Sequence, residues 1–180
     1  MEKILNLINV KSFYTTILKV VFASLILAVS AQIYIPLYYV NITGQTLAVV
    51  LLSLCLPTKM AISTMLLYIF EGLCGLPVFT SHRSGLAILL SPTGGYMIGF
   101  VFASAFISYF IKNSKTFLHT FLIVFTGLVI IFACGLLQLS LFVPSNQLLK
   151  LGLLVFIPGE IVKMFIASFF YQKYKRSNYV

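Results

Sequence analysis

Six apolar segments follow one another along the chain and constrain its fold more than any other feature. They cover approximately residues 14–35, 44–57, 59–75, 93–111, 117–140 and 152–173. About 20 apolar residues cross the hydrocarbon core of a bilayer as a helix. The second and third segments are shorter, and are predicted to form either steep or partly interrupted helices. Charged residues make up only 8% of the 180 residues, against about 25% in soluble domains. The sequence therefore predicts an all-α membrane protein, with six transmembrane helices in one domain over residues 1–180.

The positive charges between these segments predict the orientation, because cytoplasmic loops keep the excess of Lys and Arg. An even number of spans places both termini on one side. That side would hold Lys3, Lys11, Lys59, Lys112, Lys115, Lys173, Lys175 and Arg176. The other side would hold only Arg83 and Lys150. We therefore expect cytoplasmic termini, and we explain the formal charge of +9 by topology rather than by nucleic-acid binding, since the lysines form no basic stripe.

The first segment allows one alternative, which is cleavage as a signal peptide after Val29-Ser30-Ala31. The apolar stretch continues through Ile33 and Ile35 and makes a full span. Cleavage would also leave an odd number of helices, so a retained helix is favoured.

Motifs for catalysis are absent from the sequence. It has no phosphate-binding loop, GxSxG elbow, HExxH pair or paired carboxylates. Cys55, Cys74 and Cys134 stand singly in apolar stretches, which predicts neither a zinc site nor a disulfide framework. We therefore expect no enzyme activity, no cofactor and no ability of this chain alone to use ATP.

Two ionisable residues lie within the sixth apolar segment. Glu160 and Lys163 are three residues apart and so share one helical face. An ionised group within the bilayer costs about 2.5–3.5 kcal/mol on insertion scales, so each needs a partner or a task. They form either a structural ion pair or a pair of ligand-binding groups. Their place in the outer half of the predicted helix favours a cavity that opens outward.

The connection between Gly75 and Thr93 is predicted to lie on the same outer side. Its polar residues, Thr80, Ser81, His82 and Arg83, are either solvated loop residues or part of a lid.

Three predicted helices start on this outer side, and their N-termini favour an anion. In the fourth segment we expect Ser91 as the N-cap and Pro92 at the first helical position. Gly94 and Gly95 allow close approach of either a ligand or a neighbouring helix.

Several motifs together resemble one known family. The most specific is Gly75-Leu76-Pro77-Val78-Phe79, then twelve residues, then Pro92-Thr93-Gly94-Gly95-Tyr96 and Ile98-Gly99-Phe100. Supporting pieces are Ala31-Gln32-Ile33, Thr43-Gly44-Gln45 and Pro158-Gly159-Glu160 with Lys163. In these the chain resembles the BioY family, the biotin-specific S components of energy-coupling factor (ECF) transporters. The resemblance implies an S-component fold in a prokaryotic cell membrane, and capture of biotin from outside. It also implies partnership with a transmembrane coupling subunit and ATPases.

The resemblance also implies roles for individual residues. Glu160 would accept hydrogen bonds from the ureido group of biotin, and Lys163 or Arg83 would pair with its carboxylate. Gln45, Phe79, Tyr96 and Tyr34 are further candidates for the binding site, although the three aromatic residues have helix packing as an alternative role. Ser24 and Ala28 form a small-xxx-small pair that would either meet the coupling subunit or pack within the protomer.

Two other functions remain open at this point. One is an S component for a different small vitamin, and the other is a membrane scaffold with no transport role. Binding of another vitamin would indicate the first, and binding of no small molecule the second.

Overall fold

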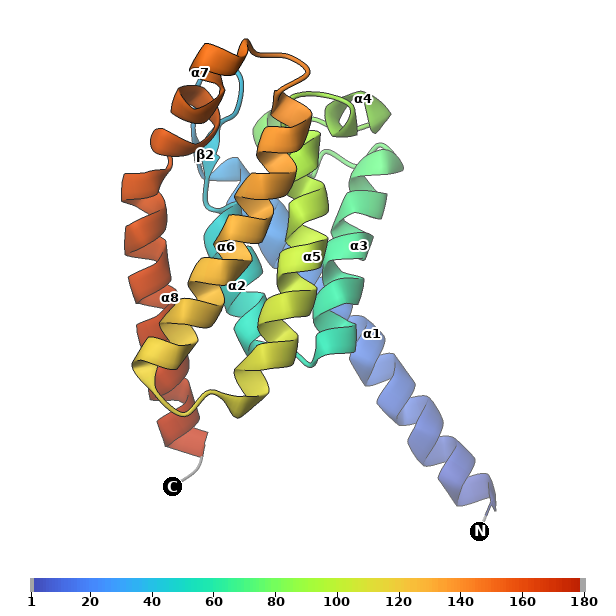
Figure 1. Cartoon of the computed structure of the whole chain (residues 1–180). Coiled ribbons are helices and arrows are strands. Elements are labelled where there is room, and N and C mark those ends of the chain that lie inside the picture. Colours follow the sequence, from blue (N-terminus) through green and yellow to red (C-terminus); the bar gives the residue numbers. More distant parts are fainter. Residues whose placement is uncertain (1, 179–180) are drawn as a thin grey trace.

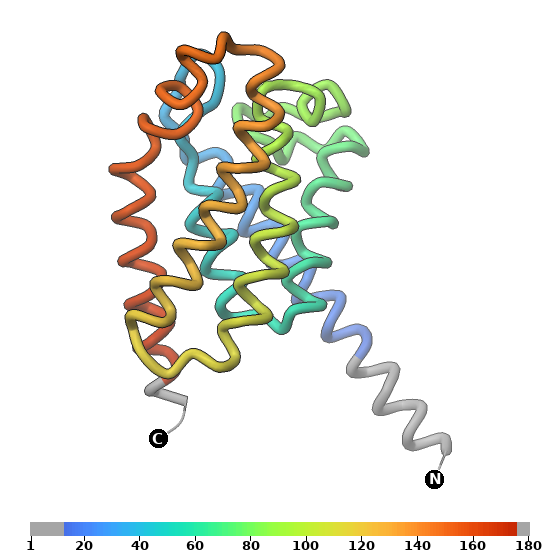
Figure 2. Tube along the Cα trace, in the orientation of Figure 1, coloured from blue at the N-terminus to red at the C-terminus, as the bar shows by residue number. Residues whose placement is uncertain are grey.

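Helices running side by side between two ends of the molecule form the fold (Figure 1). This computed structural model describes residues 2–178, and the side chains of residues 13–175. The helices that run along the bundle are α1 (Glu2–Gln32), α2 (Gln45–Cys55), α3 (Thr58–Leu73), α5 (Gly94–Phe110), α6 (Phe117–Leu139) and α8 (Ile157–Asn178). Figure 2 shows α1 leaving the bundle at one end, so that residues 13–19 are exposed.

Four helical stretches of the described chain are long and apolar enough to cross a membrane: Phe13–Gln32, Gly94–Asn113, Phe117–Leu139 and Ser145–Lys175. Large apolar side chains cover their outer surfaces, as at Phe22, Phe102 and Phe169. α2 and α3 are shorter, as the sequence predicted. The 11 residues of α2 extend about 17 Å at 1.5 Å per residue, so its first turn begins well inside the bundle.

The connections differ between the two ends. One end, here called the loop end, carries the strands β1 (Tyr34–Ile35) and β2 (Ile42–Thr43), the 3-10 turn η1 (Thr80–His82), and the short helices α4 (Leu86–Leu89) and α7 (Ser145–Leu149). At the opposite end, the connections in the described part of the chain are a tight link from α2 to α3 and the turn η2 (Ile111–Asn113) before α6. We call it the lysine end, because it carries Lys59, Lys112, Lys115, Lys173 and Lys175.

The closest helix pair is α5 with α6, and glycines make that approach possible. A Cβ atom at Gly95 would collide with the backbone oxygen of Cys134, and one at Gly99 would lie 2.8 Å from the Cα atom of Ile131. A Cβ at Gly94 would collide with the backbone oxygen of Leu89. Small residues are what close helix packing in membranes requires. Gly94 and Gly95 were expected to allow close approach of either a ligand or a neighbouring helix. In the structure they allow close packing of a loop and of α6.

Two expected helix starts are displaced. α5 begins at Gly94 and not at Pro92, because the Ser91 hydroxyl donates to the Ile88 carbonyl at 2.6 Å and holds the preceding turn. The last apolar segment was expected to start at residue 152. Instead, a π-helical turn, η3 (Lys150–Leu154), precedes α8, which starts at Ile157. Such turns are frequent near functional sites.

Candidate functional site

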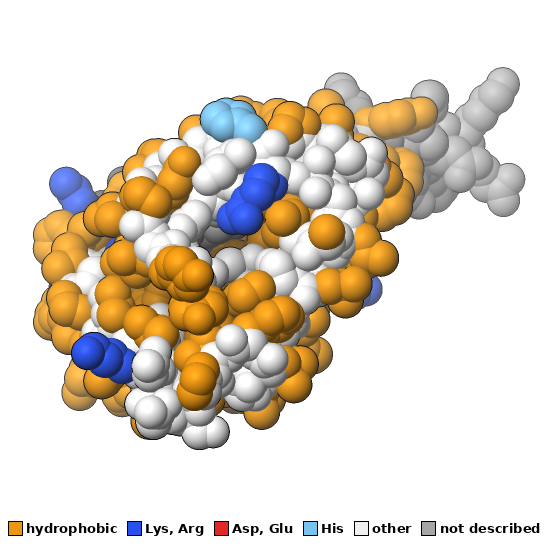
Figure 3. All heavy atoms as spheres, turned by 90° about the horizontal axis from the view of Figure 1, so that it is seen from above, with side chains coloured by type: hydrophobic (Ala, Val, Ile, Leu, Met, Phe, Trp, Pro, Cys, Tyr) orange, Lys and Arg blue, Asp and Glu red, His pale blue; other side chains and the backbone are white. Residues whose placement is uncertain are grey.

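A pocket at the loop end draws residues from nearly every part of the bundle. Its lining residues are Val40, Asn41, Thr43, Gln45, Thr46, Phe79, Thr80, Arg83, Ile88, Thr93, Tyr96, Met97, Phe100, Phe132, Phe156 and Glu160. Seen from above, this end is hollowed near its centre, with a basic side chain beside the hollow and hydrophobic side chains around it (Figure 3). The first turns of α2, α5 and α8 all contribute, so the positive ends of three helix dipoles meet around it.

Glu160 forms the charged side of the pocket with Lys163 behind it. The Lys163 ammonium lies 2.7 Å from Glu160 Oε1, and the Thr46 hydroxyl donates to the same oxygen at 2.8 Å. Lys163 also donates to the Thr43 carbonyl at 2.7 Å and to Thr46 Oγ1 at 2.8 Å. Glu160 Oε2 is buried and has no hydrogen-bond partner among the described residues. One carboxylate oxygen is thus used by the protein, while the other remains open to a donor.

Gln45 links three elements at the floor of the pocket. Its amide nitrogen donates to the Tyr68 hydroxyl on α3 at 2.7 Å, and the Thr80 hydroxyl donates to its Oε1 at 3.3 Å. The Thr43 hydroxyl also donates to Oε1, at 3.2 Å. Tyr68 in turn donates to the Val78 carbonyl at 3.1 Å. Gln45 therefore holds the pocket together, and its amide is already well satisfied.

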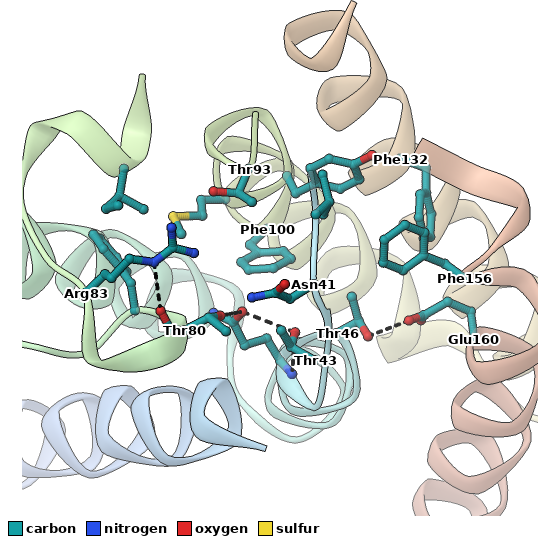
Figure 4. A pocket seen from close by; sticks show the side chains of 16 residues that line it. Asn41, Thr43, Thr46, Thr80, Arg83, Thr93, Phe100, Phe132, Phe156 and Glu160 are labelled. Atoms are coloured by element: carbon teal, nitrogen blue, oxygen red, sulfur yellow. Dashed lines mark hydrogen bonds between the residues drawn. The ribbon is translucent and has the colours of Figure 1, made fainter. Parts of the chain in front are cut away.

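Arg83 stands on the side of the pocket opposite Glu160 (Figure 4). Its Nε donates to the Thr80 carbonyl at 3.2 Å, which fixes the root of the guanidinium. The residue lines the pocket and is exposed, so it lies where the pocket meets the surface. A guanidinium in this position suits a carboxylate, which it can bind through two parallel hydrogen bonds.

Aromatic side chains form most of the apolar wall. Phe132 meets Tyr96 edge to face at 5.9 Å between ring centroids, and lies 5.7 Å from the Phe156 ring. The Tyr96 hydroxyl is turned to the Gly152 carbonyl, to which it donates at 2.8 Å. The cavity measures about 50 Å³, against about 300–1,000 Å³ for typical small-molecule sites. A ligand of vitamin size must therefore move these walls apart.

Five residues predicted from the sequence line this pocket: Glu160, Arg83, Gln45, Phe79 and Tyr96. The contact between Glu160 and Lys163 is confirmed, but Lys163 lies behind the carboxylate and is not part of the lining. Tyr34 was expected as a wall, and this is corrected. It lies in β1 opposite Thr43, with 36% of its surface exposed, and does not line the pocket.

Ser24 and Ala28 face into the bundle. Ser24 is fully buried and its hydroxyl donates to Glu71 Oε1 on α3 at 2.9 Å. Ala28 packs partly buried against the core. The expectation that these two residues form an outer docking surface is therefore corrected in favour of packing within the protomer. The exposed side of α1 carries larger residues, such as Phe22 and Val29.

Sequence reasoning missed several lining residues. Phe156 lies four residues before Glu160, and this helical spacing was a usable signal. Thr46 directly follows Gln45 but carries no motif of its own. Phe132 looks like any other apolar residue of a membrane helix, and only the three-dimensional arrangement separates it from lipid-facing residues. Phe100 ends the Ile98-Gly99-Phe100 motif, which was a usable signal.

The comparisons with known proteins agree with this geometry. The sequence profile of the BioY family matches residues 3–179. The "Biotin transporter BioY2" of Lactococcus lactis is 33% identical over 165 residues, covering 90% of this chain and 90% of that protein. The "Probable biotin transporter BioY" of Rickettsia prowazekii is 28% identical over 169 residues, covering 93% and 87%.

Among solved structures, the fold matches a crystal structure described as the S-component for biotin from an ECF-type ABC transporter. The TM-score is 0.80 at 24% identity, over 92% of this chain and 93% of the other. The shared fold and the match along almost the whole sequence lead to one assignment: the chain belongs to the BioY family.

Proposed function

We propose that this protein captures biotin from the outer side of a prokaryotic cell membrane and delivers it for ATP-driven uptake by partner subunits. The observation that carries the proposal is the placement of Glu160 and Arg83 on opposite sides of an otherwise largely apolar pocket (Figure 4). Biotin has the matching pattern, with ureido N–H donors at its head and a carboxylate at its tail.

In this proposal each polar end of biotin meets one charged residue. The unpartnered Oε2 of Glu160 accepts from the ureido N–H groups. Arg83 binds the carboxylate at the mouth, because the Lys163 ammonium already contacts Glu160, Thr43 and Thr46. Hydrogen bonds to charged groups contribute about 1.5–3 kcal/mol each. Nanomolar affinity requires a binding free energy of about −12 kcal/mol. Contacts with the aromatic walls must therefore supply most of this free energy.

The same proposal includes the arrangement of the protein in the membrane and its partner subunits. The chain acts as one transmembrane domain of six bundle helices, of which the short α2 extends through only part of the bilayer, with the loop end outside and both termini in the cytoplasm. It carries no catalytic site. A membrane-embedded coupling subunit and a pair of ATPases supply the energy, as expected of an S component in an ECF transporter.

A binding experiment on the purified protein in detergent tests the proposal. Radiolabelled biotin should bind tightly in the absence of ATP. Unlabelled thiamine and riboflavin should not displace it. Arg83→Gln should weaken biotin about 10- to 100-fold, which corresponds to the loss of one charge-assisted contact. The same substitution should change the affinity for biotinamide little, because in this ligand an uncharged amide replaces the carboxylate.

Two results would contradict the proposal. Tight binding of another vitamin without biotin binding would indicate an S component of different specificity. Binding of no small molecule would indicate a scaffold. The variant Gln147→Leu serves as a control, because Gln147 is exposed on α7 and does not line the pocket.

A further inference from the structure

The turn that carries Arg83 has an unusual backbone. Its two ends are joined by a hydrogen bond from the Phe79 N–H to the Arg83 carbonyl at 3.1 Å. Between them, Ser81 and His82 have φ angles of 63° and 55°. Left-handed conformations of this kind cost free energy in residues other than glycine and persist only where the surroundings enforce them. Something must therefore hold this turn in place.

Gln32, the last residue of α1, contacts both arms of the turn. Its Nε2 donates to the Phe79 carbonyl at 3.1 Å, and its Oε1 accepts from the His82 N–H at 3.2 Å. Only one orientation of the amide satisfies both contacts, because a carbonyl needs a donor and an N–H needs an acceptor. The two bonds lie on either side of Ser81, and the second is at the N–H of His82, so Gln32 is positioned to stabilise this conformation.

Within the turn, Arg83 Nε donates to the Thr80 carbonyl at 3.2 Å, and the other contacts from outside the turn reach its first residues. Gln45 binds the side chain of Thr80, and Phe79 is fully buried against Tyr68 at 5.6 Å between ring centroids. Those contacts anchor the start of the turn. The contact from Gln32 to the His82 N–H lies directly before Arg83 in the chain, and among the hydrogen bonds to this turn from outside it is the one nearest to Arg83.

We infer that Gln32 is a positioning residue that sets the place of Arg83, and thereby the preference of the pocket for a ligand with a carboxylate. This inference rests on the proposed function, in which Arg83 binds that carboxylate. Gln32 does not line the pocket. It acts through the backbone of the Phe79–Arg83 turn, and so the end of α1 contributes to specificity at a distance.

A double-mutant cycle with two ligands tests the inference. Gln32→Met keeps the length of the side chain and removes both hydrogen bonds. Its affinity for biotin should fall about tenfold, while its affinity for biotinamide should change less than about twofold. Arg83→Gln alone should also lower the affinity for biotin more than the affinity for biotinamide. In the Arg83→Gln background, Gln32→Met should have no further effect on biotin, because the group it positions is gone.

A merely structural role predicts a different pattern. Equal losses for biotin and biotinamide, or additive effects of the two substitutions, would overturn the inference. If Gln32→Met does not fold, Gln32→Leu takes its place in the same cycle, since it also removes both the donor to the Phe79 carbonyl and the acceptor for the His82 N–H. Gln147→Met is the matched control and should leave both affinities unchanged. If the unmodified protein binds neither ligand, the proposed function fails, which is distinguishable from additive effects in a protein that binds biotin.

Discussion

At the scale of single residues, the two carboxylate oxygens of Glu160 differ in their surroundings, and the proposed function gives each a different role. Oε1 is held by Lys163 and Thr46, whereas Oε2 has no partner among the described residues. Glu160 is 5% exposed, so loss of the neighbouring ammonium would leave a buried charge without compensation. The structural interpretation of the pair is confirmed for Oε1, while the binding interpretation stays a prediction that concerns Oε2.

This arrangement predicts opposite outcomes for single and double substitutions. Lys163→Met should lower the free energy of unfolding by about 3 kcal/mol, near the lower limit for breaking a buried pair, since the Lys163 side chain is 18% exposed. Glu160→Gln combined with Lys163→Met should recover most of this stability and still fail to bind biotin tightly. Thermal unfolding in detergent and radioligand binding measure the two effects. A Lys163→Met protein of unchanged stability would contradict the structural role.

Residue contacts were predictable where helix geometry alone determines them. Glu160 and Lys163 meet because residues three apart share a helical face. The partners of Gln45 were not predictable, because Tyr68 and Thr80 are 23 and 35 residues away and reach it only through the path of a loop. Tyr34 was misplaced because a strand of two residues gives no alternating pattern from which its outward direction could be read.

At the scale of elements, α3 and the following loop meet at Gly72. The Phe79 ring occupies the space where a Cβ atom of residue 72 would lie, and Phe79 is fully buried. The ring cannot move without shifting the turn that carries Thr80 and Arg83. The identity of a single residue in α3 therefore affects the wall of the pocket.

Gly72→Ala should displace Phe79, lower the free energy of unfolding by about 1–3 kcal/mol, as overpacking does, and weaken biotin binding. Phe79→Leu in the Gly72→Ala protein should restore part of the stability, because a smaller side chain frees the space. Gly159→Ala is the control, since no atom lies within 4 Å of its added Cβ. Melting temperature and biotin affinity are the measurements. If the Gly72→Ala protein has the same melting temperature and biotin affinity as the Gly159→Ala control, the contact between Gly72 and Phe79 is not tight.

The helices along the bundle were predictable because long apolar runs in this composition leave few alternatives to membrane helices. The structure at their ends was not. The π-helical turn before α8 and the hairpin of β1 and β2 depend on contacts with distant residues, such as the bond from the Gly44 N–H to the Ile33 carbonyl at 2.8 Å. These irregular segments hold much of the pocket, and this is why the site was predicted less completely than the helices.

At the scale of the whole molecule, the two ends differ in chemistry. The loop end holds the pocket, with Arg83 at its mouth and Lys150 in η3. The lysine end gathers Lys59, Lys112, Lys115, Lys173 and Lys175, while the side chains of Lys3, Lys11 and Arg176 lie outside the described residues. The predicted charge asymmetry is thus present along the bundle axis. It favours a cytoplasmic lysine end, and so a pocket that faces outward.

Cysteine labelling in intact cells tests this orientation. The native Cys55, Cys74 and Cys134, of which the first two are exposed, are first replaced by serine or alanine. Single cysteines are then placed at two exposed positions of opposite ends, Gln147 in α7 and Lys115 before α6. A membrane-impermeant maleimide should label position 147 directly and position 115 only after permeabilisation, because the positive-inside rule keeps Lys115 in the cytoplasm. The reverse pattern would place the pocket on the cytoplasmic side and exclude capture of biotin from outside. Uptake of radiolabelled biotin by both single-cysteine proteins, together with their partner subunits, confirms that the labelled molecules are folded.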